Sequence, residues 1–446
     1  MLKRKLYERL CSWKKESQGK TVVLLEGARQ VGKSYMAKRF AESEYKTYLV
    51  VDFSNIASEV LMLFEDDLDD LDYLFHMLSI YYDVKLYPRE TLIIFDEIQL
   101  YPKIRQNVKQ LVADGRFDYL ETGSWISLRR NVQNITIPKE ERCITVYPLD
   151  FEEFLWAMGD ESSYPVVERC YKRQKPVTSK MHHDMMKMFR QYMLVGGMPQ
   201  AVIAYAATKD FEQTENEKRK ILTLYRNDVG EYAKGWERKV LAVFDGIPRQ
   251  LSKREKKYTL ASLQKEARLR EYRTAFQWLD DARMIEICFN NRDPEKGMGK
   301  NKDRVAMKCY MPDTGLLVSH AFNEEKMKED KVLKNIMFNH LEVHEGMLLE
   351  NAVAQLLRTK GHKLLFYYHS DNENAKNRMK IDFLIRQRRK LCPITVKAGH
   401  PARHISLDKF EIKYRDKLGK KYVICTKNLE VKENLVYLPV YMTSCL

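Results

Sequence analysis

The sequence predicts an α/β protein built around a largely parallel sheet, and three observations support this prediction. Short apolar runs occur at residues 21–26, 48–52 and 92–95, and they are continuous rather than alternating. Runs of this length are typical of strands that are buried on both faces. Helical stretches such as residues 104–113 lie between the runs, and a glycine-rich turn follows the first run. Strands that alternate with helices indicate an α/β fold.

The composition limits the class of protein. A chain of 446 residues is too long for one ordinary domain, so we expect two or three domains. No apolar run approaches the roughly 20 residues that a membrane helix needs. Residues 1–5 are basic but lead into no apolar signal region, so we expect a cytoplasmic protein. The eight cysteines lack zinc-ligand spacing, and we expect them to be thiols.

The charge balance bears on partners rather than on the fold. The formal net charge is +15 and the sequence pI is about 9.2. A basic protein without a membrane anchor often binds nucleic acid, and the alternative is a solvated basic surface.

The character of the sequence changes along the chain, and we predict four segments with boundaries at 1–150, 151–235, 236–320 and 321–446. The second segment is predicted to be mostly helical and to form a lid after the first. In the third, two short amphipathic helices at 258–267 and 271–284 precede strands at 285–288 and 306–310. Two helices followed by a two-stranded wing are typical of a winged helix.

A phosphate-binding loop is predicted at residues 27–34, because GARQVGKS fits the pattern G-x-x-x-x-G-K-S in full. A predicted strand precedes the loop and a predicted helix, residues 35–41, follows it. The glycines let backbone N–H groups approach phosphate oxygens, and the helix N-terminus adds partial positive charge. We expect Lys33 to reach the β- and γ-phosphates and the Ser34 hydroxyl to bind magnesium.

An acidic pair completes the predicted ATP site. Residues 92–97, LIIFDE, place Asp96 and Glu97 directly after an apolar strand. We expect Asp96 to serve the metal and Glu97 to activate the attacking water. The sequence therefore predicts an ATPase that uses ATP and Mg²⁺. Its predicted nucleotide contacts are Gly27, Ala28, Arg29, Gln30, Val31, Gly32, Lys33, Ser34 and Asp96, and Ser34 and Asp96 are the predicted metal ligands.

Further catalytic candidates follow the fourth predicted strand, residues 118–122. Thr122, in the sequence Thr-Gly-Ser, is expected to sense the γ-phosphate or hold the water, and simple turn chemistry is the alternative. Arg142 is a candidate charge clamp, and Arg129 and Arg130 are candidate arginine fingers; a surface arginine is the alternative for each. The predicted catalytic residues are Lys33, Glu97, Thr122 and Arg142.

Several further motifs occur in a fixed order along the chain: FDEIQ at 95–99, TGS at 122–124, YPLDFEEF at 147–154, VGGMP at 195–199, DTGLL at 313–317 and GMLLEN at 346–351. With the phosphate loop, they resemble bacterial and archaeal AAA+-type predicted ATPases whose C-terminal half is an uncharacterised domain with a restriction-endonuclease-like core. The resemblance spans nearly the whole chain. It implies an AAA+-like core and a C-terminal α/β endonuclease-like domain. With the helical lid and the winged helix predicted above, these make up the expected fold.

The endonuclease-like segment departs from the pattern that the resemblance implies. In such nucleases, an aspartate begins one strand and acid-x-lysine closes the next. Asp382 and Lys397 match that pattern, but Thr395 stands where an acid is expected and Lys380 precedes Asp382. Glu350 on the preceding helix is a candidate for one more carboxylate. A hydroxyl is a poor ligand for a hard cation, so we expect a degenerate nuclease site. A buried ion pair between Asp382 and Lys397 is the accompanying interpretation.

Basic clusters lie beside these elements, at residues 253–257, 268–273 and 386–390. Such residues suit contacts with DNA phosphates, and a solvated face is the alternative. We therefore predict an ATPase whose nucleotide state is coupled to a DNA- or protein-binding C-terminal module. A signalling or scaffolding ATPase with a protein partner and an ATP-gated nuclease are the alternatives. The sequence leaves the oligomeric state open.

Overall fold

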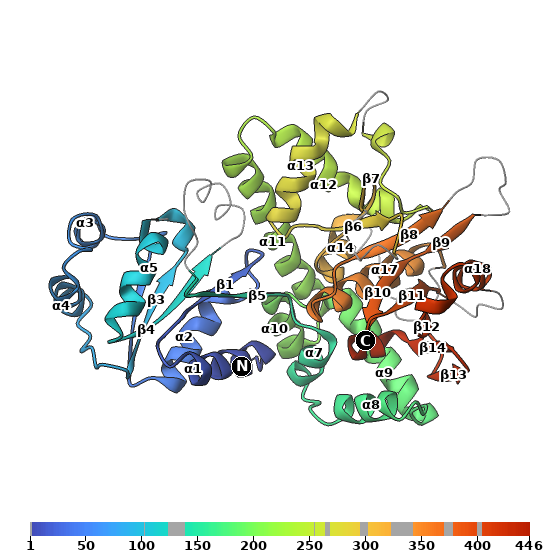
Figure 1. Cartoon of the computed structure of the whole chain (residues 1–446), viewed down its shortest axis with the longest axis horizontal. Coiled ribbons are helices and arrows are strands. Elements are labelled where there is room, and N and C mark those ends of the chain that lie inside the picture. The colour runs from blue at the N-terminus through green and yellow to red at the C-terminus, as the bar shows by residue number, and fades with distance from the viewer. Residues whose placement is uncertain are drawn as a thin grey trace. The chain divides into compact units, whose positions relative to one another are not determined.

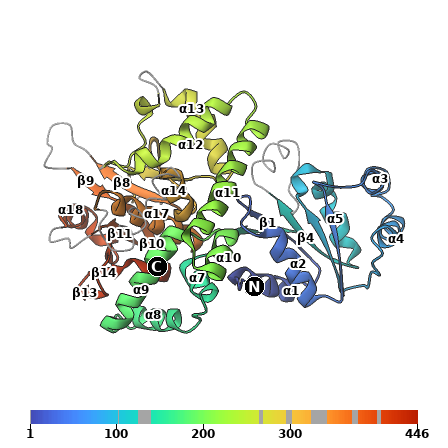
Figure 2. The ribbon, with the colours of Figure 1, turned by 180° about the vertical axis from the view of Figure 1, so that it is seen from behind.

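The computed structural model describes residues 2–101, 103–123, 139–253, 255–263, 268–294, 302–322, 342–369, 378–398 and 404–446. Backbone packing divides the chain into two compact units, which Figures 1 and 2 show from opposite sides. The N-terminal unit consists of Lys3–Tyr147 and Asp281–Arg283. The C-terminal unit consists mainly of Pro148–Asp280 and Met284–Leu446. Predicted boundaries at 235 and 320 therefore lie inside the second unit.

The N-terminal unit is an α/β domain, as predicted. Its elements are α1 (Lys5–Ser17), β1 (Val22–Gly27), α2 (Lys33–Glu44), β2 (Thr47–Asp52), α3 (Ser58–Asp66), α4 (Leu71–Tyr81), β3 (Thr91–Asp96), α5 (Lys103–Asp114), β4 (Asp118–Gly123) and β5 (Glu141–Val146). The five strands are parallel throughout and follow the order β2-β3-β4-β1-β5. The carboxyl ends of β3, β4 and β1 consequently meet at one edge of the sheet.

Both faces of this sheet are covered, which explains the continuous apolar runs. Every residue of β1, β3 and β4 is buried. One face contributes Leu24, Phe95 and Tyr119 to a core that α3, α4 and α5 complete. The alternate residues Ile94 and Leu120 are also fully buried, and α2 contacts the same strands.

The C-terminal unit begins with helices and carries further helices among its strands. They are α7 (Phe151–Ala157), α8 (Ser163–Lys172), α9 (Ser179–Val195), α10 (Pro199–Thr208), α11 (Phe211–Tyr232), α12 (Glu237–Leu251), α13 (Leu269–Asp281), α14 (Thr314–Ala321), α17 (Glu342–Thr359) and α18 (Ile405–Tyr414). Of the predicted helix at 258–267, the described part forms only the short 3-10 turn Leu260–Ser262. No helix among the described residues combines the length and hydropathy that a membrane span requires.

Two sheets complete this unit. Their strands are β6 (Glu286–Asn291), β7 (Lys302–Tyr310), β8 (Leu365–His369), β9 (Met379–Ile381), β10 (Phe383–Gln387), β11 (Lys390–Val396), β12 (Lys421–Cys425), β13 (Glu430–Lys432) and β14 (Leu435–Pro439). The orders are β7-β6-β8-β9 and β10-β11-β12-β14-β13. Because β6 pairs with β8, the predicted wing and the C-terminal segment share one sheet. Helix α18 forms a core with one face of the second sheet.

Candidate nucleotide site and C-terminal charge cluster

The phosphate loop joins β1 to α2 in the predicted context. Gln30 and Gly32 have φ angles of 67° and 90°, so two residues of the loop lie in the left-handed region. A β-carbon at Gly27 would lie 2.4 Å from the carbonyl oxygen of Val146, which explains why the first position has no side chain. Turns of this kind direct backbone N–H groups toward an anion.

The lysine of the loop lies over the loop itself. Lys33 is 5% exposed, and its Nζ donates to the carbonyl oxygens of Gly27 at 3.2 Å and Ala28 at 3.0 Å. These carbonyl groups are neutral, so an anion near the loop would compete well for the ammonium group. Lys33 also begins α2, where the helix dipole favours negative charge.

Three oxygen-bearing side chains meet at the edge of the sheet beside the loop. Ser34 Oγ donates to Asp96 Oδ1 at 2.7 Å, and Thr122 Oγ1 donates to the same carboxylate oxygen. Asp96 is the last residue of β3 and Thr122 lies near the end of β4, so the sheet itself brings them together. Carboxylate and hydroxyl oxygens are hard ligands that suit Mg²⁺. These three oxygen ligands therefore fit the predicted Mg²⁺ ion.

Glu97 is placed by an unusual backbone conformation. Its φ angle is 55°, which is uncommon for a residue with a side chain and marks a constrained position. The N–H of Glu97 donates to Thr122 Oγ1 at 3.2 Å, and Gln99 Nε2 donates to its carboxylate. The half-buried carboxylate is therefore held by Gln99, next to the residues predicted to bind the metal.

The structure does not bring every predicted catalytic residue to this edge. Arg142 pairs in register with Val23, near the start of β1, whereas Gly27 at its end pairs with Val146. Its guanidinium forms an ion pair with Glu16 at 2.8 Å and is 48% exposed. The predicted role of Arg142 therefore has no geometric support. The finger candidates Arg129 and Arg130, together with Ser124 of the Thr-Gly-Ser sequence, lie outside the described residues.

A second cluster of charges lies in the C-terminal unit, where the nuclease-like site was predicted. Glu350 on α17 and Asp382, between β9 and β10, are both buried. The Nζ of Lys308 on β7 lies 2.9 Å from Glu350 Oε1 and 3.5 Å from Asp382 Oδ1. Lys256 Nζ lies 2.7 Å from Glu350 Oε2, and Tyr310 donates to Oε1 at 2.6 Å. An ammonium group thus bridges the two carboxylates.

The electrostatics hold Glu350 and Lys308 in their charged forms. Burial alone would raise the pKa of Glu350, but the ammonium groups of Lys308 and Lys256 outweigh burial and lower it. Burial alone would likewise lower the pKa of Lys308, but the carboxylates of Glu350 and Asp382 raise it. Both partners therefore stay ionised at neutral pH.

The other nuclease-like residues are arranged differently from the prediction. Lys397 is exposed, and the ion-pair partners of Asp382 are Lys308 and Lys380 instead. A buried pair between Asp382 and Lys397 was therefore a wrong expectation. Thr395 is 6% exposed, and its hydroxyl has no hydrogen-bond partner among the described residues. Across all of the described residues, no group of three or more His, Cys, Asp or Glu side chains is placed to hold a metal.

Sequence reasoning missed Lys308 and Lys256 as members of the cluster. One signal was present for Lys308, because it interrupts the apolar pattern of residues 306–310 at a position that a strand buries. A buried lysine requires an anionic partner. Its partner Glu350 lies 42 residues further along the chain, and nothing in a single sequence links the two.

Two of the ordered motifs, VGGMP and DTGLL, meet in a buried junction. The carboxylate of Asp313 accepts hydrogen bonds from the N–H groups of Gly197 at 2.5 Å and Leu316 at 2.9 Å. A β-carbon at Gly196 would lie 2.2 Å from Asp313 Oδ1, and one at Gly315 would lie 2.4 Å from the carbonyl oxygen of Val195. These motif residues join the turn between α9 and α10 to the start of α14.

Comparison with protein families supports the class that the N-terminal site defines. Residues 19–155 match the model of the AAA domain. Residues 186–327 and 345–442 match two domains of unknown function, DUF8612 and DUF4143. The chain therefore carries a P-loop domain of the AAA class, followed by regions whose families have no assigned role. A search of curated proteins finds no similar sequence.

Solved structures give only distant similarities. The Holliday junction branch migration motor RuvB of Thermotoga maritima is 11% identical, with coverage of 74% of this chain and 95% of that chain and a TM-score of 0.30. Cdc6p from Pyrobaculum aerophilum is 11% identical, with coverage of 75% and 94% and a TM-score of 0.28. A signal transduction ATPase with a tetratricopeptide repeat sensor from Pyrococcus horikoshii is 12% identical, with coverage of 80% and 48% and a TM-score of 0.27. Similarities this distant do not define a function.

Proposed function

We propose that this protein is a magnesium-dependent ATPase of the AAA+ class. The observation that carries the proposal is the meeting of Ser34, Asp96 and Thr122 directly beside the phosphate loop. A serine that ends a phosphate loop and an aspartate that ends a neighbouring strand are the side chains that P-loop enzymes use for the metal.

Each residue has a separate task in this proposal. Lys33 leaves its loop carbonyls and binds the β- and γ-phosphates. Ser34 and Asp96 provide oxygen ligands, and Glu97 accepts a proton from the attacking water. The hydroxyl of Thr122 donates a hydrogen bond that orients Asp96. The same hydroxyl accepts a hydrogen bond from the N–H of Glu97. When bound, Mg²⁺ neutralises the charge that develops on the transferred phosphoryl group.

We further propose that the C-terminal unit is a binding module for DNA. Helices α12 and α13 precede the β6–β7 hairpin, and the N–H of Tyr258 donates to the Met307 carbonyl at 2.8 Å. This backbone hydrogen bond, next to two helices and a hairpin, supports a winged-helix module. The exposed side chains of Arg386, Arg388 and Arg389 add a second basic surface.

The nuclease-like site is proposed to be inactive. Lys308 occupies the position between Glu350 and Asp382 that a divalent cation would need, and Lys256 and Lys380 add further positive charge. This arrangement speaks against an ATP-gated nuclease. A signalling or scaffolding ATPase that acts on a protein partner remains the second candidate, because the basic surfaces also suit an acidic protein.

The test is the rate of ATP hydrolysis with and without DNA at several salt concentrations. A DNA-associated ATPase should be stimulated at low salt, and the stimulation should fade as salt rises. Lys33→Ala is the control for contaminating ATPases. Hydrolysis that DNA does not change at any salt concentration would favour the protein-partner function, and no hydrolysis by the wild type would overturn the proposal.

A further inference from the structure

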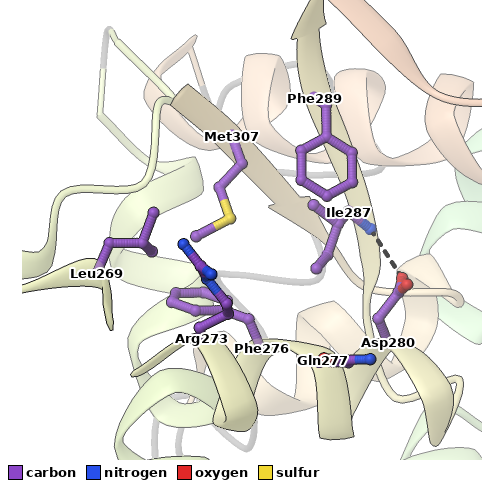
Figure 3. Close-up of a pocket in the computed structure, with 8 residues that line it drawn as sticks. All are labelled: Leu269, Arg273, Phe276, Gln277, Asp280, Ile287, Phe289 and Met307. Carbon is purple, nitrogen blue, oxygen red and sulfur yellow. Dashed lines mark hydrogen bonds between the residues drawn. The ribbon is translucent and has the colours of Figure 1, made fainter. Parts of the chain in front are cut away.

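A surface pocket of about 280 Å³ lies between α13 and the β6–β7 hairpin. Figure 3 shows its walls, which come from the helix on one side and from the two strands on the other. Leu269 and Phe276 line it from the helix, and Ile287, Phe289 and Met307 line it from the strands. These side chains offer an apolar surface that includes two aromatic rings and a thioether. Such a surface suits the burial of a flat aromatic ring of a ligand.

The polar residues of the pocket lie on the helix. Arg273 and Gln277 are exposed, so they stand at the rim. Asp280 Oδ1 accepts a hydrogen bond from the N–H of Ile287 at 3.3 Å, which ties the helix to β6 at one end of the pocket. The pocket thus combines apolar walls with hydrogen-bonding groups of both kinds.

The charge around the rim identifies the class of ligand. Arg268, Arg270 and Arg273 are all exposed on this segment. Within the described part of the chain, Arg273 forms no hydrogen bond or ion pair, and neither does Arg270. Of the residues that line the pocket, Arg273 is the cation and Asp280 is the acid, and Asp280 already accepts the N–H of Ile287. Arginine beside an apolar recess suits a ligand that carries anionic groups next to a ring.

We propose that this pocket binds one unstacked base of single-stranded nucleic acid, with Arg273 contacting a neighbouring phosphate. Aromatic and apolar side chains that receive a base, combined with cationic side chains along the backbone, are the usual basis of single-strand binding. The bases of a duplex are paired and stacked, so they cannot enter a recess of this kind. The inference rests on the proposed nucleic-acid function and adds that single strands are preferred at this site.

The experiment compares affinities of the full-length protein for a fluorescein-labelled 20-nucleotide single strand and for its duplex by fluorescence anisotropy. Ile287→Trp fills the pocket without changing charge, and Thr274→Trp places the same side chain on an exposed position of α13 that does not line it. Because Ile287→Trp keeps the base out of the pocket, we expect it to weaken single-strand binding roughly 10-fold or more. Duplex binding should change less than about twofold, and Thr274→Trp should leave both affinities unchanged.

A second pair of variants keeps the test independent of the fold of Ile287→Trp. Arg273→Gln and Arg270→Gln each remove one exposed charge, so both should make the salt dependence shallower by a similar amount. Only Arg273→Gln should reduce the ratio of single-strand to duplex affinity. A reduction that is equal in the two variants would overturn the assignment of Arg273 to the pocket.

Other outcomes separate this inference from the proposed function. Equal affinity of the wild type for single strand and duplex, or undiminished binding of an abasic strand, would overturn the base pocket but leave DNA binding intact. Polyglutamate that displaces the strand from the wild type but not from Ile287→Trp would assign the pocket to an acidic polypeptide instead. No binding of either nucleic acid at low salt would overturn both the pocket and the DNA-binding part of the proposed function.

Discussion

Ser34 Oγ donates a hydrogen bond of 2.7 Å to Asp96 Oδ1, although 62 residues separate the two in the chain. The bond joins the phosphate loop to the end of β3, and in the proposed function it lies where the cation and the terminal phosphates bind. The first two predictions concern the residues on either side of this bond.

Lys33→Ala should abolish ATP hydrolysis and weaken nucleotide binding. Lys33 Nζ already contacts the loop carbonyls of Ala28 and Gly27, at 3.0 and 3.2 Å. The measurements are steady-state phosphate release and calorimetric titration with ATP. Turnover like that of the wild type would contradict the assignment of the site.

Glu97→Gln should separate binding from chemistry. The substitution keeps the size of the side chain and its contact with Gln99 but removes the base. Loss of a general base typically lowers the rate about 10²–10⁴-fold. ATP binding, measured by calorimetry, should persist. If binding is lost together with hydrolysis, Glu97 has a structural or metal-binding role instead.

The third prediction concerns the hairpin turn between β10 and β11. Gln387 pairs with Lys390, so Arg388 and Arg389 form a two-residue turn, and their φ angles are 46° and 68°. Asn-Gly is the favoured pair in such turns, and arginine in this conformation costs about 1–2 kcal/mol per residue. In the proposed function, these arginines offset that cost by contacting DNA phosphates.

Replacement of Arg388 by Asn and Arg389 by Gly should therefore stabilise the protein by roughly 1 kcal/mol or more and weaken DNA binding. The log–log salt slope should become shallower by about 0.9 for each lost contact with a duplex phosphate. Alanine at both positions is the matched control, because it removes the charges but leaves the backbone strain of the turn. A double Asn-Gly variant with unchanged DNA affinity would leave these arginines as solvated surface.

The sequence predicted the N-terminal domain well because its signals are local. Continuous apolar runs mark β1 and β3 since both faces of the sheet are covered, and the loop pattern fixes the start of α2. The order of the strands was not predictable in this way. That order places Arg142 four residues before the end of β5, away from the loop, although sequence position alone made it a candidate.

The C-terminal site shows the opposite case, because its decisive contacts are long-range. Asp382 and Glu350 were predicted from the nuclease-like pattern that the resemblance implies, and the structure brings both carboxylates to Lys308. The cation between them is Lys308 of β7. Lys308 lies 74 residues before Asp382 in the chain. Register and sheet pairing decide which lysine is buried, and no local pattern encodes that choice.

The fourth prediction follows from a buried acid next to the nucleotide site. Glu121 is fully buried in β4, and neither of its carboxylate oxygens has a hydrogen-bond partner among the described residues. Burial, together with the nearby carboxylate of Glu141, raises its pKa well above the usual 4.5. The folded protein therefore keeps a proton that the unfolded chain releases, so stability should fall as pH rises above about 4.5.

Glu121→Gln should remove this dependence, because glutamine carries no titrating proton. Relative to the wild type, the variant should gain about 1 kcal/mol or more of stability between pH 5 and pH 8. Urea denaturation at both pH values measures the difference. Glu65→Gln, at an exposed position of α3, is the matched control and should leave the pH dependence unchanged. Parallel pH profiles of the wild type and Glu121→Gln would show that Glu121 ionises normally.

The last prediction is that the purified protein does not cleave DNA with Mg²⁺ or Mn²⁺. Lys308 already neutralises Glu350 and Asp382 from a position between them, so a cation would have to displace a buried ammonium group. Thr395 supplies no charge and Lys380 adds the wrong one. Manganese is the more forgiving test, because it accepts a wider range of ligands than magnesium. Asp382→Ala is the control that separates this site from a contaminating nuclease.

Two substitutions test the reason for inactivity. Thr395→Glu alone should not create a metal site, because Lys308 still bridges the carboxylates. Lys308→Met alone should destabilise the protein by about 3–5 kcal/mol, since it leaves buried carboxylates without their shared cation. In the double variant, the added carboxylate completes a set of three, and Mn²⁺ should bind and restore part of the lost stability, measured by calorimetry and thermal melting. Cleavage by the wild type that disappears in Asp382→Ala would show instead that Lys308 leaves the site during catalysis.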